Sequence, residues 1–364
     1  MQHTPSAILA VSSLDRYTTG IPNSVARTDS ALINLYSNIG EPGNDFQLSS
    51  PNAFIYGYIT RIAISQIQLE YRIPTVVPSN RVSPFGVNDP TRPIRIGNDV
   101  LAIFWQVPGV IPDEYRLAEI NLPYGFYTPE ELAAMLEVQI RANIPTGLSN
   151  MRVTYANSGS GEFPTSQSGI PTQAGNIGYG NAFTFSTLDT SGNPTGQFFG
   201  FPDVSGMIGF GFTQNQILSA LKTYRLIGIT VQVCKDNVVA TLIQGASPNF
   251  VYTPYVDIVS NNLTKFQKVK DADTSVNGRN GLISRLYVSG VGFPIATSPT
   301  FALGSEPFTI TTDLNTPKLV RWNKDETVYN MDFKLFDHYG DLIYWTNENP
   351  TEFQMTLMCM EEDD

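Results

Sequence analysis

Histidine is the first residue type to examine, because it is the commonest general base and a frequent metal ligand near neutral pH. The sequence contains only two, His3 and His338. Neither has a second histidine three or four residues away, and no Cys-x-x-Cys pair occurs in the chain. Since zinc and iron sites need such clustered ligands, the sequence predicts no metal centre.

Paired carboxylates are the second possibility, because a glycosidase needs two acidic side chains and some β-sandwiches cleave sugars. Each acidic group here has a structural explanation as a helix start, a polar loop, the two sides of a turn or a solvated tail. In that order the groups are Glu130 with Glu131, Asp271 with Asp273, Asp337 with Asp341, and residues 361–364. The glycine motifs of P-loop and Rossmann nucleotide sites are missing as well. We therefore predict no catalytic residue and no cofactor, so the chain is not expected to be an enzyme.

Cysteine and tryptophan are rare, and we expect them to be structural. Two cysteines, Cys234 and Cys359, are too few for the disulfide framework of a small secreted domain. Both lie in apolar, strand-like runs, which predicts buried free thiols. The three tryptophans could stack on a sugar ring, but tryptophans in strands lie more often in a core or an interface. They are Trp105, Trp322 and Trp345.

Composition favours a soluble all-β protein that does not bind nucleic acid. Charged residues make up 15% of the 364 residues, whereas 29 glycines and 25 prolines supply many turns. The 22 basic and 33 acidic residues give a net charge of -11, which opposes attraction to nucleic-acid phosphates. No stretch approaches the roughly 18 apolar residues of a membrane span, and the first ten residues do not resemble a secretory signal. We expect synthesis in the cytosol.

Short runs rich in β-branched and aromatic residues predict many strands. The longest covers residues 58–71 and ends before Pro74. Their spacing suits a sandwich of two antiparallel sheets. Gly340 can adopt positive φ, so residues 337–341 predict the tight turn of a hairpin near the end of the chain. The other predicted strands are 99–107, 115–122, 151–155, 182–185, 224–234, 238–244, 252–259, 282–288, 308–312, 328–336, 342–346 and 353–360.

One short helix is indicated after Thr128. Thr128 and Glu131 match a capping box, and Pro129 takes the first helical position, where its missing N–H costs nothing. Apolar residues then follow at helical spacing until Pro145, which predicts a helix that lies on a sheet. These residues are Leu132, Met135, Leu136 and Ile140.

The chain contains no internal repeat and no charged linker that would divide it. We predict an N-terminal arm or edge-pairing segment at residues 1–50 and one elaborated domain at residues 51–364. Residues 157–181 are rich in glycine and poor in apolar side chains, so we expect a long projecting hairpin loop. Residues 197–212 are expected to form a second irregular connection.

Three parts of the sequence carry a resemblance to a known family. The first is the segment SLDRY at residues 13–17. The second is EINLPYGFYTPEELAAML at residues 119–136, where a strand ends and a capped helix follows. The third comprises residues 255–273, backed by residues 282–288, and FKLFDHYGD at residues 333–341. Together they resemble the single jelly-roll penton and minor capsid proteins of large eukaryotic double-stranded DNA viruses and virophages.

This resemblance implies a jelly roll, in which eight antiparallel strands form two packed sheets, and a structural capsid role without catalysis. The implied position is the penton at a vertex of an icosahedral virion, where five copies close a ring through heterologous contacts. The implied partners are further copies of the chain and other capsid proteins, including the major capsid protein. We expect residues 1–30 and the 157–181 loop to be contact or exposed elements.

Other functions stay open from the sequence alone. The chain could be a minor capsid protein at another place in the shell. It could also be a receptor- or carbohydrate-binding β-sandwich, which a concave polar pocket formed by the glycine-rich loop and exposed aromatic residues would favour. A hydrolase would require two carboxylates that converge in a cleft with a raised pKa.

Overall fold

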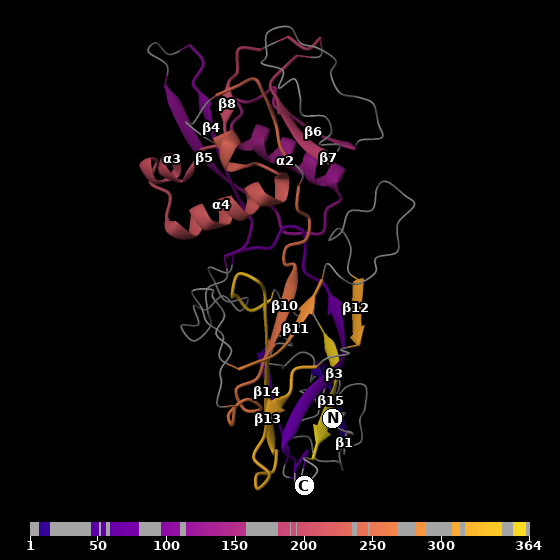
Figure 1. Ribbon diagram of the computed structural model, residues 1–364. Helices are drawn as coiled ribbons and strands as arrows, with labels where there is room; N and C mark the ends of the chain where they lie inside the picture. Colours follow the sequence, from indigo (N-terminus) through magenta and orange to yellow (C-terminus); the bar gives the residue numbers. More distant parts are fainter. Residues whose placement is uncertain are drawn as a thin grey trace, which may run out of the picture.

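The computed structural model contains two bodies that lie one above the other (Figure 1). One, the sandwich, consists of strands, and the other, the helical body, contains four helices and two small sheets. The chain leaves the sandwich after β3 and returns to it at β10. The structure describes residues 7–14, 45–50, 52–55, 59–79, 96–109, 114–157, 181–189, 191–193, 195–234, 239–246, 248–267, 281–288, 308–313, 317–343 and 352–361.

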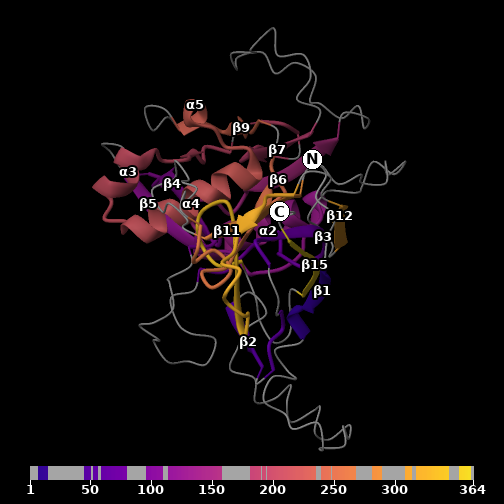
Figure 2. The same cartoon turned by 60° about the horizontal axis from the view of Figure 1, so that its bottom comes forward.

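The first sheet of the sandwich is antiparallel and has the strand order β1-β15-β3-β12, with β13 also paired to β3. Its edge strand β1 runs beside β15 in both Figure 1 and Figure 2. The strands are β1 (Ala7–Ser12), β3 (Arg61–Tyr71), β12 (Phe308–Asp313), β13 (Val320–Arg321) and β15 (Phe353–Met360).

A β-bulge explains the uneven apolar pattern of β3. Thr356 of β15 pairs with Gln66, whereas the next residue, Leu357, pairs with Ile64, so Ser65 is the extra residue in β3. Side chains normally alternate between the two faces of a strand, and one extra residue shifts that alternation. Ile64 and Ile67, three positions apart, are therefore both buried.

The second sheet has the antiparallel order β11-β10-β14-β2. Alternation is regular in β14, where Met331, Phe333 and Leu335 are buried while the residues between them are partly exposed. This pattern is what a strand with one face on a core requires. The strands are β2 (Asp45–Ser49), β10 (Tyr255–Val259), β11 (Leu282–Tyr287) and β14 (Asn330–Phe336).

The two sheets pack face to face around one hydrophobic core. Phe46 of β2 and Phe333 of β14 come from the second sheet, and Phe353 of β15 comes from the first. The ring centroids of Phe46 lie 5.7 Å from those of both Phe333 and Phe353. Burying each such side chain contributes about 1.5–3 kcal/mol, and a buried interface between two sheets defines a β-sandwich.

The helical body has a separate core. Its two three-stranded sheets have the orders β5-β4-β8 and β6-β7-β9, with α2 against β6 and β5 and α4 against β4. The strands are β4 (Val100–Gln106), β5 (Tyr115–Asn121), β6 (Arg152–Asn157), β7 (Asn181–Ser186), β8 (Phe199–Gly200) and β9 (Leu242–Gln244). The helices are α2 (Pro129–Asn143), α3 (Val204–Gly209), α4 (Gln214–Ile227) and α5 (Val231–Cys234).

Helix α2 confirms the predicted capping box. The backbone N–H of Glu131 donates to Thr128 Oγ1 over 3.2 Å, and the backbone N–H of Thr128 donates to Glu131 Oε2 over 2.9 Å. Both donors would otherwise lack a partner within the helix. Leu132, Leu136 and Ile140 are fully buried and face the sheets, as the spacing predicted.

Helix α4 corrects the predicted strand at residues 224–234. Thr213 and Gln216 form a second capping box, and the helix ends at Gly228 with φ of 75°. A Cβ at Gly228 would lie 2.1 Å from the carbonyl oxygen of Ala246, so only glycine fits this helix end. The buried positions Ile217, Ala220, Tyr224 and Ile227 follow helical spacing. The prediction of one short helix was therefore wrong, although antiparallel sheets dominate the fold as expected.

Some of the other predictions are confirmed, and others are wrong or lie outside the described residues. Strands occur at most predicted places, with bounds that differ by a few residues. Residues 342–346 give only an isolated bridge between Leu342 and Phe336 in their described part, which ends at residue 343. Residues 197–212 contain β8 and α3 instead of an irregular connection. β6 and β7 form the predicted hairpin, with Asn157 paired to Asn181, and residues 158–180 lie outside the described part. Within the predicted arm, the described residues form β1 and β2.

The cysteines and two tryptophans take structural places. Cys234 and Cys359 are buried free thiols, as predicted, and burial raises the pKa of the former to about 12 and of the latter to about 11. Cys359 lies in β15, but Cys234 lies in α5 and not in a strand. Trp105 packs on the core of the helical body and Trp322 belongs to that of the sandwich, while Trp345 lies outside the described residues.

The α2 interface predicts a sharp contrast between two positions on one helix. Leu136→Ala removes a fully buried side chain and should lower the free energy of unfolding by about 2–5 kcal/mol. Val138→Ala changes a side chain that is 62% exposed and should alter it by less than about 0.5 kcal/mol. Chemical denaturation followed by circular dichroism measures both values. Similar losses in the two variants would contradict the assigned face.

Candidate functional site

Metal binding is the first property to consider, because the sequence predicted no metal centre. Among them, no group of three or more histidine, cysteine, aspartate and glutamate side chains is arranged to hold a metal ion. Of the two histidines, His338 is partly buried in the turn after β14, and His3 lies outside the described part. Asp337 and Asp341 lie in the same turn as His338, whereas Asp271 and Asp273 are not described.

Among described helices, none is long and apolar enough to span a membrane.

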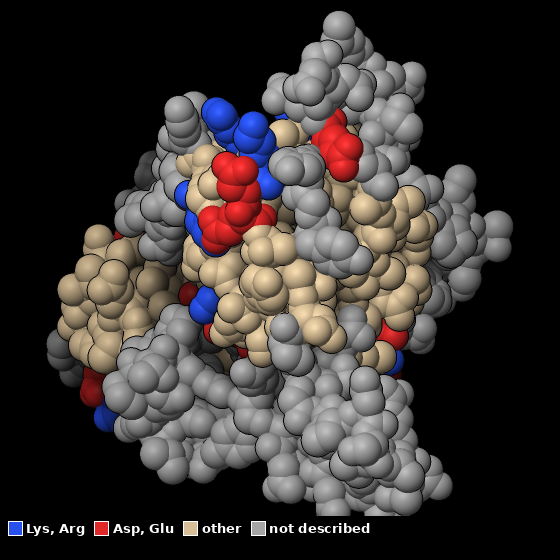
Figure 3. All heavy atoms as spheres, turned by 90° about the horizontal axis from the view of Figure 1, so that it is seen from below, with Lys and Arg blue, Asp and Glu red and all other residues tan. Residues whose placement is uncertain are grey.

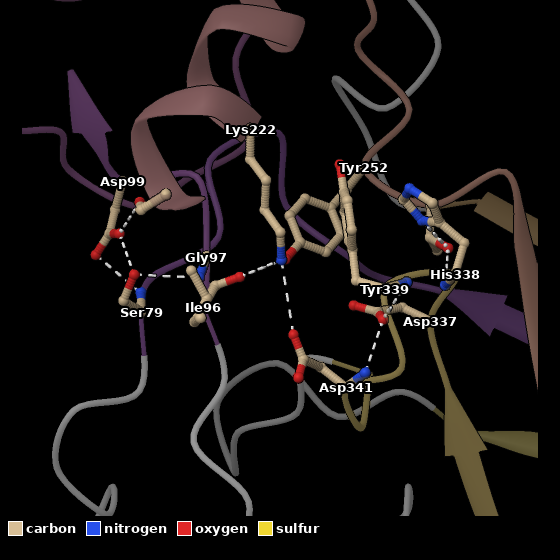
Figure 4. Close-up of polar contacts among 12 residues, drawn as sticks. Ser79, Ile96, Gly97, Asp99, Lys222, Tyr252, Asp337, His338, Tyr339 and Asp341 are labelled. Carbon is tan, nitrogen blue, oxygen red and sulfur yellow. Dashed lines mark hydrogen bonds and ion pairs between the residues drawn. The ribbon is translucent and has the colours of Figure 1, made fainter. Parts of the chain in front are cut away.

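A group of charged and aromatic side chains lies where α4 meets the turn at residues 337–341. Lys222 extends from α4 toward this turn (Figure 4). Its Nζ donates to the carbonyl oxygen of Ile96 and lies 3.6 Å from Asp341 Oδ2. The same nitrogen lies 3.7 Å from the ring centroid of Tyr339, which is a cation–π contact. This side chain is only 10% exposed, so the ion pair is largely screened from water.

The turn itself is built around Asp337, which is 1% exposed. Its Oδ1 accepts from the backbone N–H groups of Tyr339 over 2.9 Å and Asp341 over 3.0 Å. The N–H of Asp337 donates to the carbonyl of Asp341, and Gly340 has φ of 91°. Aspartate commonly stabilises turns in this way, and a φ of this sign favours glycine. The predicted hairpin turn is confirmed, because the Ile343 N–H donates to Leu335 across it.

His338 connects the turn to both bodies. Its Nδ1 lies 3.0 Å from Thr253 Oγ1, and its backbone N–H donates to the same oxygen. Its Nε2 lies 3.1 Å from Nη1 of Arg225, an exposed residue of α4. Arg225 also donates to the hydroxyl of Tyr339 over 3.4 Å, and burial raises the pKa of that hydroxyl, which keeps it protonated. The junction therefore consists of side chains that contact one another.

A second polar group contacts α4 at Ser219, about one turn before Lys222. Asp99 Oδ1 accepts from the hydroxyl groups of Ser79 and Ser219, and its Oδ2 accepts from the Ser79 N–H over 2.8 Å. Gly97 lies beside it in Figure 4, and a Cβ there would lie 1.9 Å from the carbonyl oxygen of Val77. The close approach of backbone to backbone requires glycine. This arrangement positions chain segments, and its groups already serve as donors and acceptors to one another.

Sequence reasoning found the turn but not its partner on α4. Lys222 and Asp341 are 119 positions apart, and their pairing depends on how the two bodies meet. One signal was visible: Lys222 ends a stretch, residues 204–221, that contains no charged residue. The lysine marks the point at which charged residues return to the chain, but it does not indicate which residue it pairs with.

That uncharged stretch forms an exposed apolar surface. Helices α3 and α4 project at the side of the helical body in Figure 1, and five of their large apolar side chains are 37–61% exposed. Val204 and Ile208 are four positions apart on α3, and Leu218 and Leu221 are three apart on α4, so each pair lies on one side of its helix. Exposed apolar side chains that lie together mark interaction sites more often than single ones do. We call this set the α3–α4 surface: Val204, Ile208, Phe210, Leu218 and Leu221.

The outer face of the first sheet contains a shallow pocket with uncharged polar walls. Hydroxyl and amide groups line it beside the backbone of β1, and no aromatic side chain takes part. A sugar-binding site usually offers an aromatic ring for stacking against the sugar, which this pocket lacks. Figure 3 shows the molecule from below, on the side of the sandwich. The described surface in this view is mostly uncharged, with acidic and basic groups in a few clusters. The polar lining includes Ser12, Gln66, Gln68, Gln354 and Thr356.

The predicted contact elements are only partly described. Of residues 1–30, the structure describes residues 7–14, which include the edge strand β1 with Ile8 67% exposed. An edge strand presents backbone donors and acceptors on its unpaired side. Of residues 157–181, only the two ends in the β6–β7 hairpin are described.

The Lys222 junction predicts a cost for removing one charge. Lys222→Met should lower the free energy of unfolding by about 1–3 kcal/mol, because Asp341 would keep a carboxylate that is only 22% exposed without its cation. Lys334→Met is the matched control: its pair with Asp45 is about one-third exposed on both sides and should contribute less than about 1 kcal/mol. Urea titration of both variants measures the difference. Equal stabilities would refute a structural role for Lys222.

No family model matches the sequence, and no curated protein matches it. Solved structures do match. The mavirus penton protein aligns with a TM-score of 0.43 and 10% identity, over 89% of this chain and 94% of that protein. A chain of the Sputnik virophage aligns with a TM-score of 0.39 and 11% identity, over 98% of each chain.

Proposed function

We propose that the chain is a structural capsid protein, and that it forms the penton at the vertex of an icosahedral shell of a large double-stranded DNA virus or virophage. The observation that carries this proposal is the α3–α4 surface, which exposes five large apolar side chains in a stretch without charge. Such a surface is costly in water unless another molecule covers it. It belongs to the helical body, whose core is separate from that of the sandwich, so it is available for contact with another subunit.

The sandwich supports the jelly-roll part of the proposal. Each sheet has a path of four antiparallel strands, β1-β15-β3-β12 and β11-β10-β14-β2, and a jelly roll has eight strands in two sheets. We further propose that residues 51–364 act as one elaborated unit with the helical body inserted between β3 and β10, and that residues 1–50 contribute edge strands and an arm. Edge strands allow pairing with a neighbouring chain.

The proposed assembly is a ring of five copies with other capsid proteins, including the major capsid protein, around it. A ring forms when one face of a subunit meets a different face of the next and the rotation closes. The net charge of -11 makes direct contact with nucleic acid unfavourable, so the interfaces are between proteins. The protein would be made in the host cytoplasm and act in the virion without catalysis.

The polar pocket on the outer face of the first sheet does not favour a carbohydrate-binding function over the proposed capsid function. Its lining lacks an aromatic ring, and residues 158–180 of the glycine-rich loop lie outside the described part. A minor capsid protein at another place in the shell would not need to close a ring of five copies.

The penton proposal predicts the mass of the purified protein. The chain has a mass of 40.1 kDa, so a pentamer should have a mass of about 200 kDa in light scattering at several protein and salt concentrations. A monomer at every concentration would contradict self-assembly into a penton and favour a minor capsid protein that needs partners.

The α3–α4 surface predicts which substitution disrupts association. Ile208→Asp places a charge where the side chain is 61% exposed, so the chain should fold normally but associate at least tenfold more weakly, since burying an unpaired carboxylate opposes contact. Val138→Asp, at a 62% exposed position on α2, is the matched control and should associate as the natural chain does. Sedimentation equilibrium measures both. Unchanged association of the Ile208 variant would remove this surface from the interface.

A further inference from the structure

We propose that the contact between α4 and the turn at residues 337–341 is an acid-sensitive lock between the helical body and the sandwich. It is closed when the imidazole of His338 is neutral and opens when that imidazole gains a proton. The two bodies have separate hydrophobic cores, so polar contacts at the junction help to fix how they sit against each other. This inference does not depend on the capsid proposal.

The hydrogen-bond partners of His338 specify a neutral ring. A guanidinium group has only donors, so the contact of 3.1 Å between Arg225 Nη1 and His338 Nε2 requires that Nε2 accept. The proton of the neutral ring then lies on Nδ1, which donates to Thr253 Oγ1 over 3.0 Å. The Thr253 hydroxyl is free to accept there, because its own proton is donated to the carbonyl of Tyr255 over 2.7 Å. Each donor in this chain of contacts meets an acceptor.

Protonation removes the acceptor that Arg225 uses. A protonated imidazole carries hydrogen on both nitrogens, so Nε2–H would face Nη1–H, and two positive groups would lie in contact. Arg225 is exposed and can turn toward water, which is the easier response. Its hydrogen bond to Tyr339 at 3.4 Å depends on the same position and would be lost with it. Helix α4 would then keep only Lys222 on the turn.

The charged and titratable groups around His338 fix the direction of the response. From α4, Lys222 and Arg225 oppose a proton on the ring. Within the turn, Asp337 and Asp341 favour it, although the first accepts from backbone N–H groups and the second pairs with Lys222. Tyr339 stacks on the ring from the turn, Tyr255 contacts it from β10, and Tyr71 of β3 contacts Thr253 behind it. The guanidinium group of Arg285, in β11, lies over the ring of Tyr255.

These groups leave the neutral ring preferred while the lock is closed and allow protonation once Arg225 has moved. Because the proton binds the open form better than the closed form, the open form should be several-fold more populated at pH 5.5 than at pH 7.5. The side chains that gain the proton or move away lie at the junction. The opening should loosen the backbone of the last turn of α4 and of residues 337–343. Few other groups can respond in this range, because the chain has only one more histidine, His3.

Hydrogen exchange measured by mass spectrometry on the full chain tests this proposal. After correction for the intrinsic effect of pH, amides in residues 337–343 and 222–228 should exchange about threefold to tenfold faster at pH 5.5 than at pH 7.5, as expected when local opening loses a hydrogen bond to a charged group. In His338→Gln the amide oxygen can still accept from Arg225, so the pH dependence should vanish. The matched control His3→Gln should respond as the natural chain does.

The outcomes separate the proposal from its rivals. A natural chain without faster exchange at pH 5.5 would overturn it, and so would a His338→Gln variant that keeps the full response, because carboxylates would then be responsible. If His338→Gln does not fold, Arg225→Gln gives the same decision. That variant should show at pH 7.5 the exchange that the natural chain shows at pH 5.5, with no further change on acidification. A closed lock in Arg225→Gln at pH 7.5 would also overturn the proposal.

Discussion

The packing of two antiparallel sheets against each other is the constraint on which the rest of the structure depends. Phe46, Phe333 and Phe353 bring both sheets to one buried aromatic cluster, so neither sheet can shift without opening the core. The bulge at Ser65 keeps the apolar residues of β3 on the inner face along its whole length. This packing fixes the ends of β3, β10 and β14, from which the helical body and the junction turn emerge.

The helical body is attached to this frame without sharing its core. Because the two apolar clusters are separate, its orientation depends on the chain connections and on contacts such as those of Lys222 and Arg225. Polar contacts of this kind fix a geometry with less stabilisation than an apolar core would give, and they respond to protonation. The same helices expose the α3–α4 surface, so a change at the junction would move an interaction surface relative to the sandwich.

Much of this fold was predictable, and the failures have physical causes. The capping box at Thr128 and the run of strand-forming residues at 328–336 are local signals, and both were found. The helix α4 was missed because residues 224–234 are rich in β-branched and apolar residues, and a short run of this kind does not distinguish a strand from a buried helix. The decisive signal, the capping box at Thr213 and Gln216, lay upstream of that run, directly after the connection predicted at residues 197–212. The pairing of Lys222 with Asp341 depends on tertiary contacts and has no local signal.

Self-assembly of the proposed penton into a closed five-fold ring is tested most directly by the symmetry of the purified protein. Electron cryo-microscopy, with particles classified without imposed symmetry, measures it. We expect rings of five copies in which the α3–α4 surface of each subunit lies against a different face of its neighbour. Single subunits, or two-fold pairs that leave the α3–α4 surface uncovered, would contradict it.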